Sequence, residues 1–381
     1  MSVASKNFQR FFSQYKVLTL LCAIIVIWVF FNQMTGGAFI SARNISNLFR
    51  QMAITGIMAS GMVFVIIAGE IDLSVGSLLG VLGGVAAILD YTYHWPLPLI
   101  FISVILLGCL VGAWTGYWVA YLKVPSFIAT LAGLLAFRGV LLGLTKGTTV
   151  PVESEGLIAF GQGYLSPLMG YVVAAITFAV LALVTIKNRT SRQRYNLSVP
   201  PVWQDTGRLA VFAAVILGFT FTLNAYEGFP IPVLVLLVIL GLFTFVANNT
   251  VFGRRIYSIG SNLEATRLSG INVKFIKLSV FVVMGLMCAL AGLTTTARLA
   301  AGGPSAGNMG ELDAIASCFI GGASSRGGVG TVYGALIGAL IMASLDNGMS
   351  MLGMDSFWQM IVKGSILLLA VWIDVMSAGE R

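Results

Sequence analysis

The sequence predicts an all-α polytopic membrane protein with about 10–12 transmembrane helices, some of them broken or re-entrant. Hydrophobic residues make up 58% of its 381 residues and charged residues only 9%, and the mean hydropathy is +0.94. Because a soluble domain carries roughly 25% charged residues, this chain cannot hide its apolar surface by folding in water. No segment shows the alternating pattern, about ten residues long, that is typical of a transmembrane barrel strand.

The apolar segments predict about twelve helices. Their expected ranges are 17–34, 51–69, 73–90, 98–121, 126–145, 166–186, 208–224, 230–248, 276–297, 312–323, 328–346 and 357–375. A straight crossing needs about 20 residues. The segment 312–323 and the break at 69–73 are therefore candidates for broken or re-entrant helices.

Residues 1–16 differ from the rest of the chain because aromatic and basic residues recur there at helical spacing. This pattern predicts an amphipathic helix on the cytoplasmic membrane surface, with a disordered tail as the alternative. Residues 17–381 are expected to form a single transmembrane domain. That domain includes a basic cytoplasmic loop at 187–208 and a second loop at 249–275.

The formal net charge of +8 has a membrane explanation. Lys and Arg collect in the cytoplasmic loops of bilayer proteins, which is a simpler interpretation than binding to nucleic acid. If the N-terminus is cytoplasmic and the spans alternate, about 16 of the basic residues lie inside. Both termini and both basic loops are then expected in the cytoplasm.

Glu70 and Asp72 stand in the apolar run "FVIIAGEIDLSVGSLLG", and no other charged residue occurs between Gln51 and Leu89. A carboxylate in hydrocarbon is expensive and needs water, a polar cavity or a partner. The structural interpretation is that Asp72 starts the next helix and an ion pair pins the helix ends. The alternatives are that the two acids line an inner mouth, couple to a partner, or relay protons as in secondary transporters.

The loop 249–275 contains "EATRLSGI", which predicts a short helix. Asn262 can cap it, Glu264 lies in its first turn, and Gly270 can end it. The small residues Ala265 and Thr266 would let this helix approach a partner closely. An ordinary basic loop helix is the alternative interpretation.

The sequence contains no motif for covalent chemistry or nucleotide binding. It has no G-x-x-x-x-G-K-[ST], no H-E-x-x-H, no Cys/His cluster and no nucleophile elbow. The single histidine, His94, lies in "YTYHWPLP", whose aromatic residues favour an interfacial belt over a site. We therefore expect a chain that is not an enzyme and holds no cofactor or metal itself.

Several stretches, taken together, resemble one family. "EATRLSG" resembles the E-A-A-x-x-x-G signature of ABC importer permeases, with Thr266 in place of the second alanine. Three further stretches resemble the same family: "AGEIDLSVGS", "VPSFIATLAG" and "SAGNMGELDAIASCFIGG". In this order, from about residue 44 to residue 372, the chain resembles the permease subunits of bacterial sugar ABC importers of the ribose and xylose group. The resemblance is greatest to the D-xylose members. It is carried by the extra region 188–248 and by the stretches "PVLVLLVILGLF" and "MASLDNGMSML".

The resemblance implies a division of labour between subunits. Two permease copies form the pathway, a separate ATPase subunit binds the ATP, and a periplasmic sugar-binding protein delivers the substrate. The helix at 262–271 would be the coupling helix that docks on the ATPase. The implied function is import of a pentose by a multi-pass protein of the bacterial inner membrane. D-xylose is the pentose that the resemblance favours. The rival interpretation from another class is an ion-coupled secondary sugar transporter.

A second set of polar residues lies near the expected outer face. It comprises Glu311 and Asp313 in "GELDAI", and Asp346 and Asn347 in "SLDNGMS". In the light of the resemblance, they could contact the sugar or the binding protein along the pathway. The alternative is that they only cap the ends of their helices.

Overall fold

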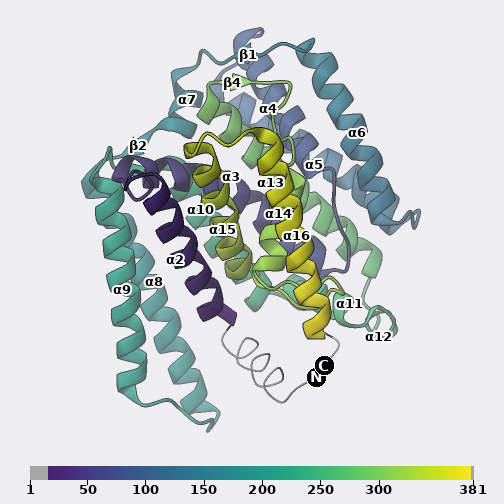
Figure 1. The fold of residues 1–381 in the computed structure, drawn as a ribbon. Helices are drawn as coiled ribbons and strands as arrows, with labels where there is room; N and C mark the ends of the chain where they lie inside the picture. The colour runs from purple at the N-terminus through teal and green to yellow at the C-terminus, as the bar shows by residue number, and fades with distance from the viewer. Residues whose placement is uncertain (1–15, 379–381) are drawn as a thin grey trace.

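The computed structural model describes residues 16–378 and is built almost entirely of helices (Figure 1). Nine of the helices described in this range are long and apolar enough to cross a membrane. They are α3, α5, α6, α8, α9, α10, α13, α15 and α16. The predicted all-α polytopic class is thereby confirmed. The amphipathic helix expected in residues 1–16 falls, but for its last residue, outside the described range.

The helices, in chain order, are α2 (Lys16–Met34), α3 (Ala42–Ile67), α4 (Val75–Tyr91), α5 (Leu97–Ala120), α6 (Ser126–Thr145), α7 (Glu155–Gln162), α8 (Pro167–Arg194), α9 (Val202–Asn224), α10 (Ile231–Asn249), α11 (Val251–Ser261), α12 (Leu263–Leu268), α13 (Val273–Leu299), α14 (Gly310–Ile320), α15 (Val332–Met351) and α16 (Ser356–Ala378). The strands are β1 (Val150–Pro151), β2 (Tyr164–Leu165), β3 (Phe229–Pro230) and β4 (Ala301–Gly302). Strand β1 pairs with β4, and β2 with β3, both antiparallel.

The start of α3 differs from the sequence prediction. The helix was expected from residue 51, but it begins at Ala42. The side chain of Ser41 accepts a hydrogen bond from the Asn44 N–H at 3.4 Å and so caps the first turn. Hydropathy misses this turn because the residues that follow the cap, such as Arg43, are polar.

Two helices begin inside the fold, next to each other. Residues 69–74, which follow α3, are not helical, and α4 starts after them at Val75. Residues 303–309 are likewise not helical, and α14 starts after them at Gly310. The two starts approach so closely that a Cβ on Gly76 would collide with the Gly307 carbonyl and the Glu311 carboxylate. Glycine is therefore required at residue 76. The break expected at 69–73 is present between α3 and α4, and the segment expected at 312–323 forms α14, whose 11 residues are too few for a straight crossing.

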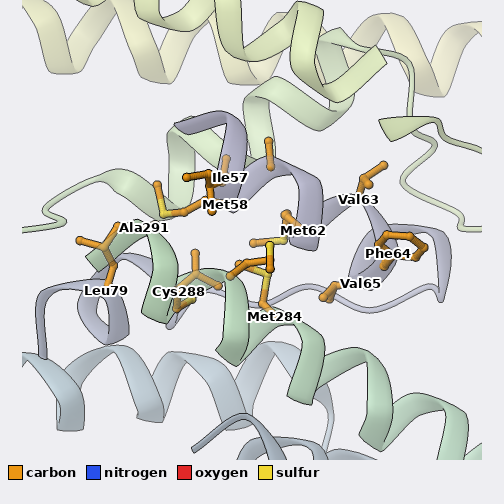
Figure 2. Close-up of a cluster of buried hydrophobic side chains, with 14 of the residues drawn as sticks. Ile57, Met58, Met62, Val63, Phe64, Val65, Leu79, Met284, Cys288 and Ala291 are labelled. Carbon is orange, nitrogen blue, oxygen red and sulfur yellow. The ribbon is translucent and has the colours of Figure 1, made fainter. Parts of the chain in front are cut away.

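Helix α13 is the centre of the packing and contacts α3, α4 and α5. Methionine side chains fill the space between α3 and α13, where Met58 and Met62 gather with Met284 (Figure 2). All three are at most 3% exposed. Methionine suits this position because its unbranched, polarisable side chain fills irregular gaps between helices.

The elements divide between two ends of the molecule. Helices α11 and α12 and the turn that joins α8 to α9 lie at the lower end in Figure 1, whereas α7, β1 and β4 lie at the upper end. The two basic loops predicted at 187–208 and 249–275 therefore share one end. This is the arrangement that the charge distribution predicted for the cytoplasmic side.

Candidate transport cavity and docking helix

Helix α12 has the local structure that its sequence predicts. Asn262 is its N-cap, and the side-chain oxygen of Asn262 accepts a hydrogen bond from the Ala265 N–H at 2.9 Å. Gly270 follows the helix with a φ of +79°, a left-handed conformation that favours glycine. Glu264 lies in the first turn, where a carboxylate is favoured by the helix dipole.

The two small side chains of α12 face in different directions. Ala265 is exposed, but Thr266 is only 4% exposed and its hydroxyl donates to the Asn262 carbonyl at 2.8 Å. Only Ala265 can therefore meet a partner. Leu268 is 85% exposed and Leu263 43% exposed. Helix α12 therefore presents Leu263, Ala265 and Leu268 on its exposed side.

Helix α11 ties α12 to the membrane helices. The Tyr257 hydroxyl of α11 donates to the Gly330 carbonyl at 2.7 Å, just before α15. Burial, with a smaller effect of Tyr333, raises the pKa of this hydroxyl, so it stays a donor. The Gly328 N–H, in the same loop, donates to the Ile67 carbonyl at the end of α3 at 2.8 Å. The loop before α15 thus links α11 to the end of α3.

Glu70 and Asp72 have separate partners although they are two residues apart. Glu70 forms an ion pair with Lys277 of α13. Asp72 is 4% exposed and accepts hydrogen bonds from the N–H and the hydroxyl of Ser74, at 2.9 Å and 2.6 Å. Ser74, not Asp72, is the N-cap of α4. Asp72 therefore shapes the turn that leads into the cap.

The second set of polar residues is also divided. The Lys363 ammonium of α16 bonds to a carboxylate oxygen of Asp313 at 3.0 Å and of Asp346 at 2.9 Å. Asn347 points elsewhere and accepts from the Asn44 side chain at 2.9 Å. Glu311 is only 9% exposed and lies against Gly76. The structure therefore joins Asp313 and Asp346 through a lysine that our sequence prediction did not include.

A cavity of about 300 Å³ opens beside this ion-pair group, between α3, α13, α14, α15 and α16. The polar side chains that line it include Asn308, Arg298, Gln359, Asp313, Asp346 and Lys363. Apolar side chains, Met58 and Leu79 among them, complete its wall. A larger hollow of about 440 Å³ lies around the start of α3 and lacks such a paired group of opposite charges. The smaller cavity is the better candidate for transport.

The cavity lies away from α12. On α3 it is lined by residues between Gln51 and Met58, whereas the far end at Ile67 contacts the loop beside α11. Ile67 lies nine positions after Met58 along α3, or about 14 Å away. The lining residues of α13 and α15 likewise come from the halves remote from α12.

Lys363 was missed because the sequence prediction weighed only acids near span ends. A signal was present, since Lys363 is the one charged residue in the stretch 356–373. An ionisable residue inside an apolar span is expensive and is commonly functional. Arg298 gave no comparable signal, because basic residues near helix ends are ordinary.

Comparison with known proteins agrees with these features. The family model described as "Branched-chain amino acid transport system / permease component" matches residues 44–192 and 200–371. The xylose transport system permease protein of Escherichia coli K12 is 57% identical over 366 residues, covering 96% of this chain and 93% of its own. The corresponding protein of Haemophilus influenzae Rd is 56% identical over 362 residues, covering 95% and 96%.

A ribose import permease protein of Escherichia coli K12 is more distant, at 36% identity over 336 residues, with 88% of this chain and 87% of its own covered. No solved structure matches this chain. The resemblance to the ribose and xylose permeases is thereby confirmed. With its multiple apolar helices, the chain belongs to this family of transport-system permease components, which are membrane permeases and not enzymes.

Proposed function

We propose that this chain is the permease subunit of an ATP-driven ABC importer that carries D-xylose across the bacterial inner membrane. The observation that carries the proposal is the 57% identity, over almost the whole chain, to a xylose transport system permease protein. A ribose permease of the same family is only 36% identical. D-xylose is therefore a better supported substrate than ribose.

The proposal includes three partners. A separate ATPase subunit binds the ATP, because the sequence contains no nucleotide-binding motif. A periplasmic sugar-binding protein delivers the substrate at the end opposite α12. A second copy of the chain completes the pathway, and residues 17–381 act as one permease domain in each copy.

Helix α12 is the proposed contact with the ATPase. Leu263, Ala265 and Leu268 are exposed, and Glu264 adds a charge to the same short helix. A groove that receives the helix would cover the two leucines and pack against Ala265. The connection through Tyr257 and Gly330 supports transmission of ATPase movement to α15.

One observation favours the rival function, an ion-coupled secondary transporter. Lys363, Asp313 and Asp346 are ionisable and mostly enclosed by the protein, as in ion-coupled pathways. However, Lys363 bonds to both acids at once and so offsets one of their two negative charges in place. The exposed leucines of α12 have no explanation in this rival function.

A co-purification experiment tests the docking of α12. Ala265→Trp adds bulk to the proposed contact, and overpacking of a fitted contact costs about 1–3 kcal/mol, where each 1.4 kcal/mol is a tenfold change in affinity. We expect the variant to insert normally but to lose most of the ATPase subunit during purification. Uptake of labelled D-xylose should fall with it.

Lys274→Ala is the control, since Lys274 lies just past α12 and its ammonium is 5.6 Å from the centre of the Tyr121 ring. It should retain the ATPase. Full retention and full uptake by Ala265→Trp would show that α12 is not the docking site.

A further inference from the structure

The cavity beside Lys363 lies apart from the docking surface on α12. We propose that this cavity is a binding subsite for a monosaccharide inside the permease, with Asp346 and Gln359 among the groups that hold the sugar hydroxyls. The inference rests on the proposed function, because it requires a sugar to arrive at the end of the molecule remote from α12.

The chemistry of the lining suits a sugar. A monosaccharide carries several adjacent hydroxyl groups, each of which can donate one hydrogen bond and accept others. The cavity offers carboxylate acceptors on Asp313 and Asp346 and donors on Arg298, Asn308 and Gln359. This mixture of acceptors and donors is unusual between apolar helices, where each polar group must be justified by a partner or a function.

The protein does not satisfy these carboxylates by itself. Within residues 16–378, Lys363 bonds to one oxygen of each, and the Oδ1 atoms of Asp313 and Asp346 are buried without a donor. Asp313 is 8% exposed. The Asp346 side chain is 29% exposed and lines the cavity. Buried acceptors without donors are rare in proteins, and the hydroxyl groups of a bound molecule would supply the missing donors after a small rotation of the carboxylates.

The backbone beside the cavity has an unusual conformation. Asn308 and Gly310 line the cavity where the unwound segment meets the start of α14. Met309, between them, has a φ of +64°, a left-handed conformation that is strained for a residue with a side chain. Such strain clusters at binding sites. The segment before α14 thus brings Asn308 and Gly310 to the wall of the cavity.

The cavity does not continue through the protomer. Its wall includes Met58 and Leu79, which belong to the buried cluster between α3 and α13 (Figure 2). Both residues are at most 3% exposed. A sugar that enters from the end remote from α12 would therefore halt against this methionine-rich wall. A closed inner end is what distinguishes a subsite from an open channel.

Protection of an introduced cysteine tests the inference in membrane vesicles that contain the complete importer. Ser350→Cys places a thiol in the cavity wall, in a chain in which Cys22 and Cys109 are replaced by alanine. Cys288 and Cys318 are buried and can remain. A membrane-impermeant thiol reagent is added on the outer side, with D-xylose in millimolar excess or with sucrose as the osmotic control.

We expect D-xylose to slow labelling of Ser350→Cys at least about threefold, because a bound ligand excludes the reagent from an enclosed pocket. Sucrose should leave the rate unchanged. Thr148→Cys is the matched control, since Thr148 is exposed in the loop between α6 and β1 and does not line the cavity, and its labelling should not respond to D-xylose. Thr55→Cys, on the opposite wall, provides a second probe if Ser350→Cys does not fold.

A further substitution tests the residue assignment. Asp346→Asn keeps the size of the side chain and leaves Lys363 paired with Asp313, and it should weaken the protection by D-xylose. Equal labelling rates with and without D-xylose, or no labelling at either cysteine, would overturn the subsite. If the same vesicles still took up D-xylose, the proposed function would stand. Failure of the unmodified importer to take up D-xylose would instead contradict the proposed function.

Discussion

Lys277, in the second turn of α13, forms an ion pair with Glu70, in the segment that follows α3. Both side chains are at most 17% exposed. The pair joins the chain just after α12 to the segment that leads into α4. It therefore adds to the bonds from Tyr257 to Gly330 and from Gly328 to Ile67, which connect the α11–α12 end with the membrane helices.

Lys277→Met should destabilise the protein. The substitution keeps much of the apolar stem but leaves Glu70 mostly buried without its cation, and breaking a buried pair costs about 3–5 kcal/mol at full burial, less here because both groups are partly exposed. Thermal unfolding in detergent measures the loss. Lys274→Met is the control, because Lys274 lies over the Tyr121 ring and takes part in none of the ion pairs within the described residues. This variant should unfold close to the unmodified protein. Equal stabilities of the two variants would show that the pair contributes little.

Asp72 allows a finer comparison. Asp72→Asn keeps an oxygen that can accept from Ser74, whereas Asp72→Ala leaves the buried N–H and hydroxyl of Ser74 without that acceptor. The unpaired groups should cost about 1–3 kcal/mol, so the alanine variant should be clearly less abundant and less stable. The asparagine variant should lose about 1 kcal/mol or less and transport normally per molecule. Transport abolished in Asp72→Asn at normal abundance would assign the carboxylate to the pathway or to coupling.

The packing of α5 on α13 depends on glycine at the crossing. A Cβ on Gly285 would collide with the Gly108 carbonyl, and one on Gly108 would lie 2.5 Å from the Gly285 carbonyl. Gly285→Ala should therefore force the helices apart and cost about 1–3 kcal/mol. Gly139→Ala is the matched control because a Cβ there meets nothing within 4 Å. A thermal unfolding temperature that falls equally in both variants would contradict this account of the packing.

The orientation in the membrane is testable with single cysteines at the two ends of the fold. Ser198→Cys, in the α8–α9 turn, and Ser269→Cys, after α12, should react with an impermeant reagent only from the cytoplasmic side, since basic loops stay inside. Thr148→Cys, between α6 and β1, should react only from the outside. All three positions are exposed. Labelling of Ser198→Cys or Ser269→Cys from the periplasm would reverse the orientation.

The positions of most helices could be predicted because apolar runs in a membrane protein are long and are bounded by polar turns. The start of α3 could not be predicted from hydropathy, since Arg43 and Asn44 belong to a helix that extends beyond its apolar part. The cap at Asn262 and the stop at Gly270 are local features, and the structure confirms both.

The candidate cavity could be predicted only in part. Asp313 and Asp346 drew attention because acids are costly in apolar segments, but their common partner Lys363 lies in another helix and is brought to them by the fold. The burial of Thr266 was missed for the same reason, because the side of α12 that faces the protein is fixed by tertiary packing. Local patterns predict elements and caps, whereas contacts between distant elements require the structure.

The energy source of uptake tests the central claim most directly. Proteoliposomes that contain this permease, its ATPase subunit and the sugar-binding protein should accumulate labelled D-xylose only when ATP is present on the side of α12. Ionophores that collapse proton and sodium gradients should leave the initial rate unchanged. Accumulation of D-xylose by the permease alone, driven by an ion gradient and independent of ATP, would contradict the account and identify an ion-coupled transporter.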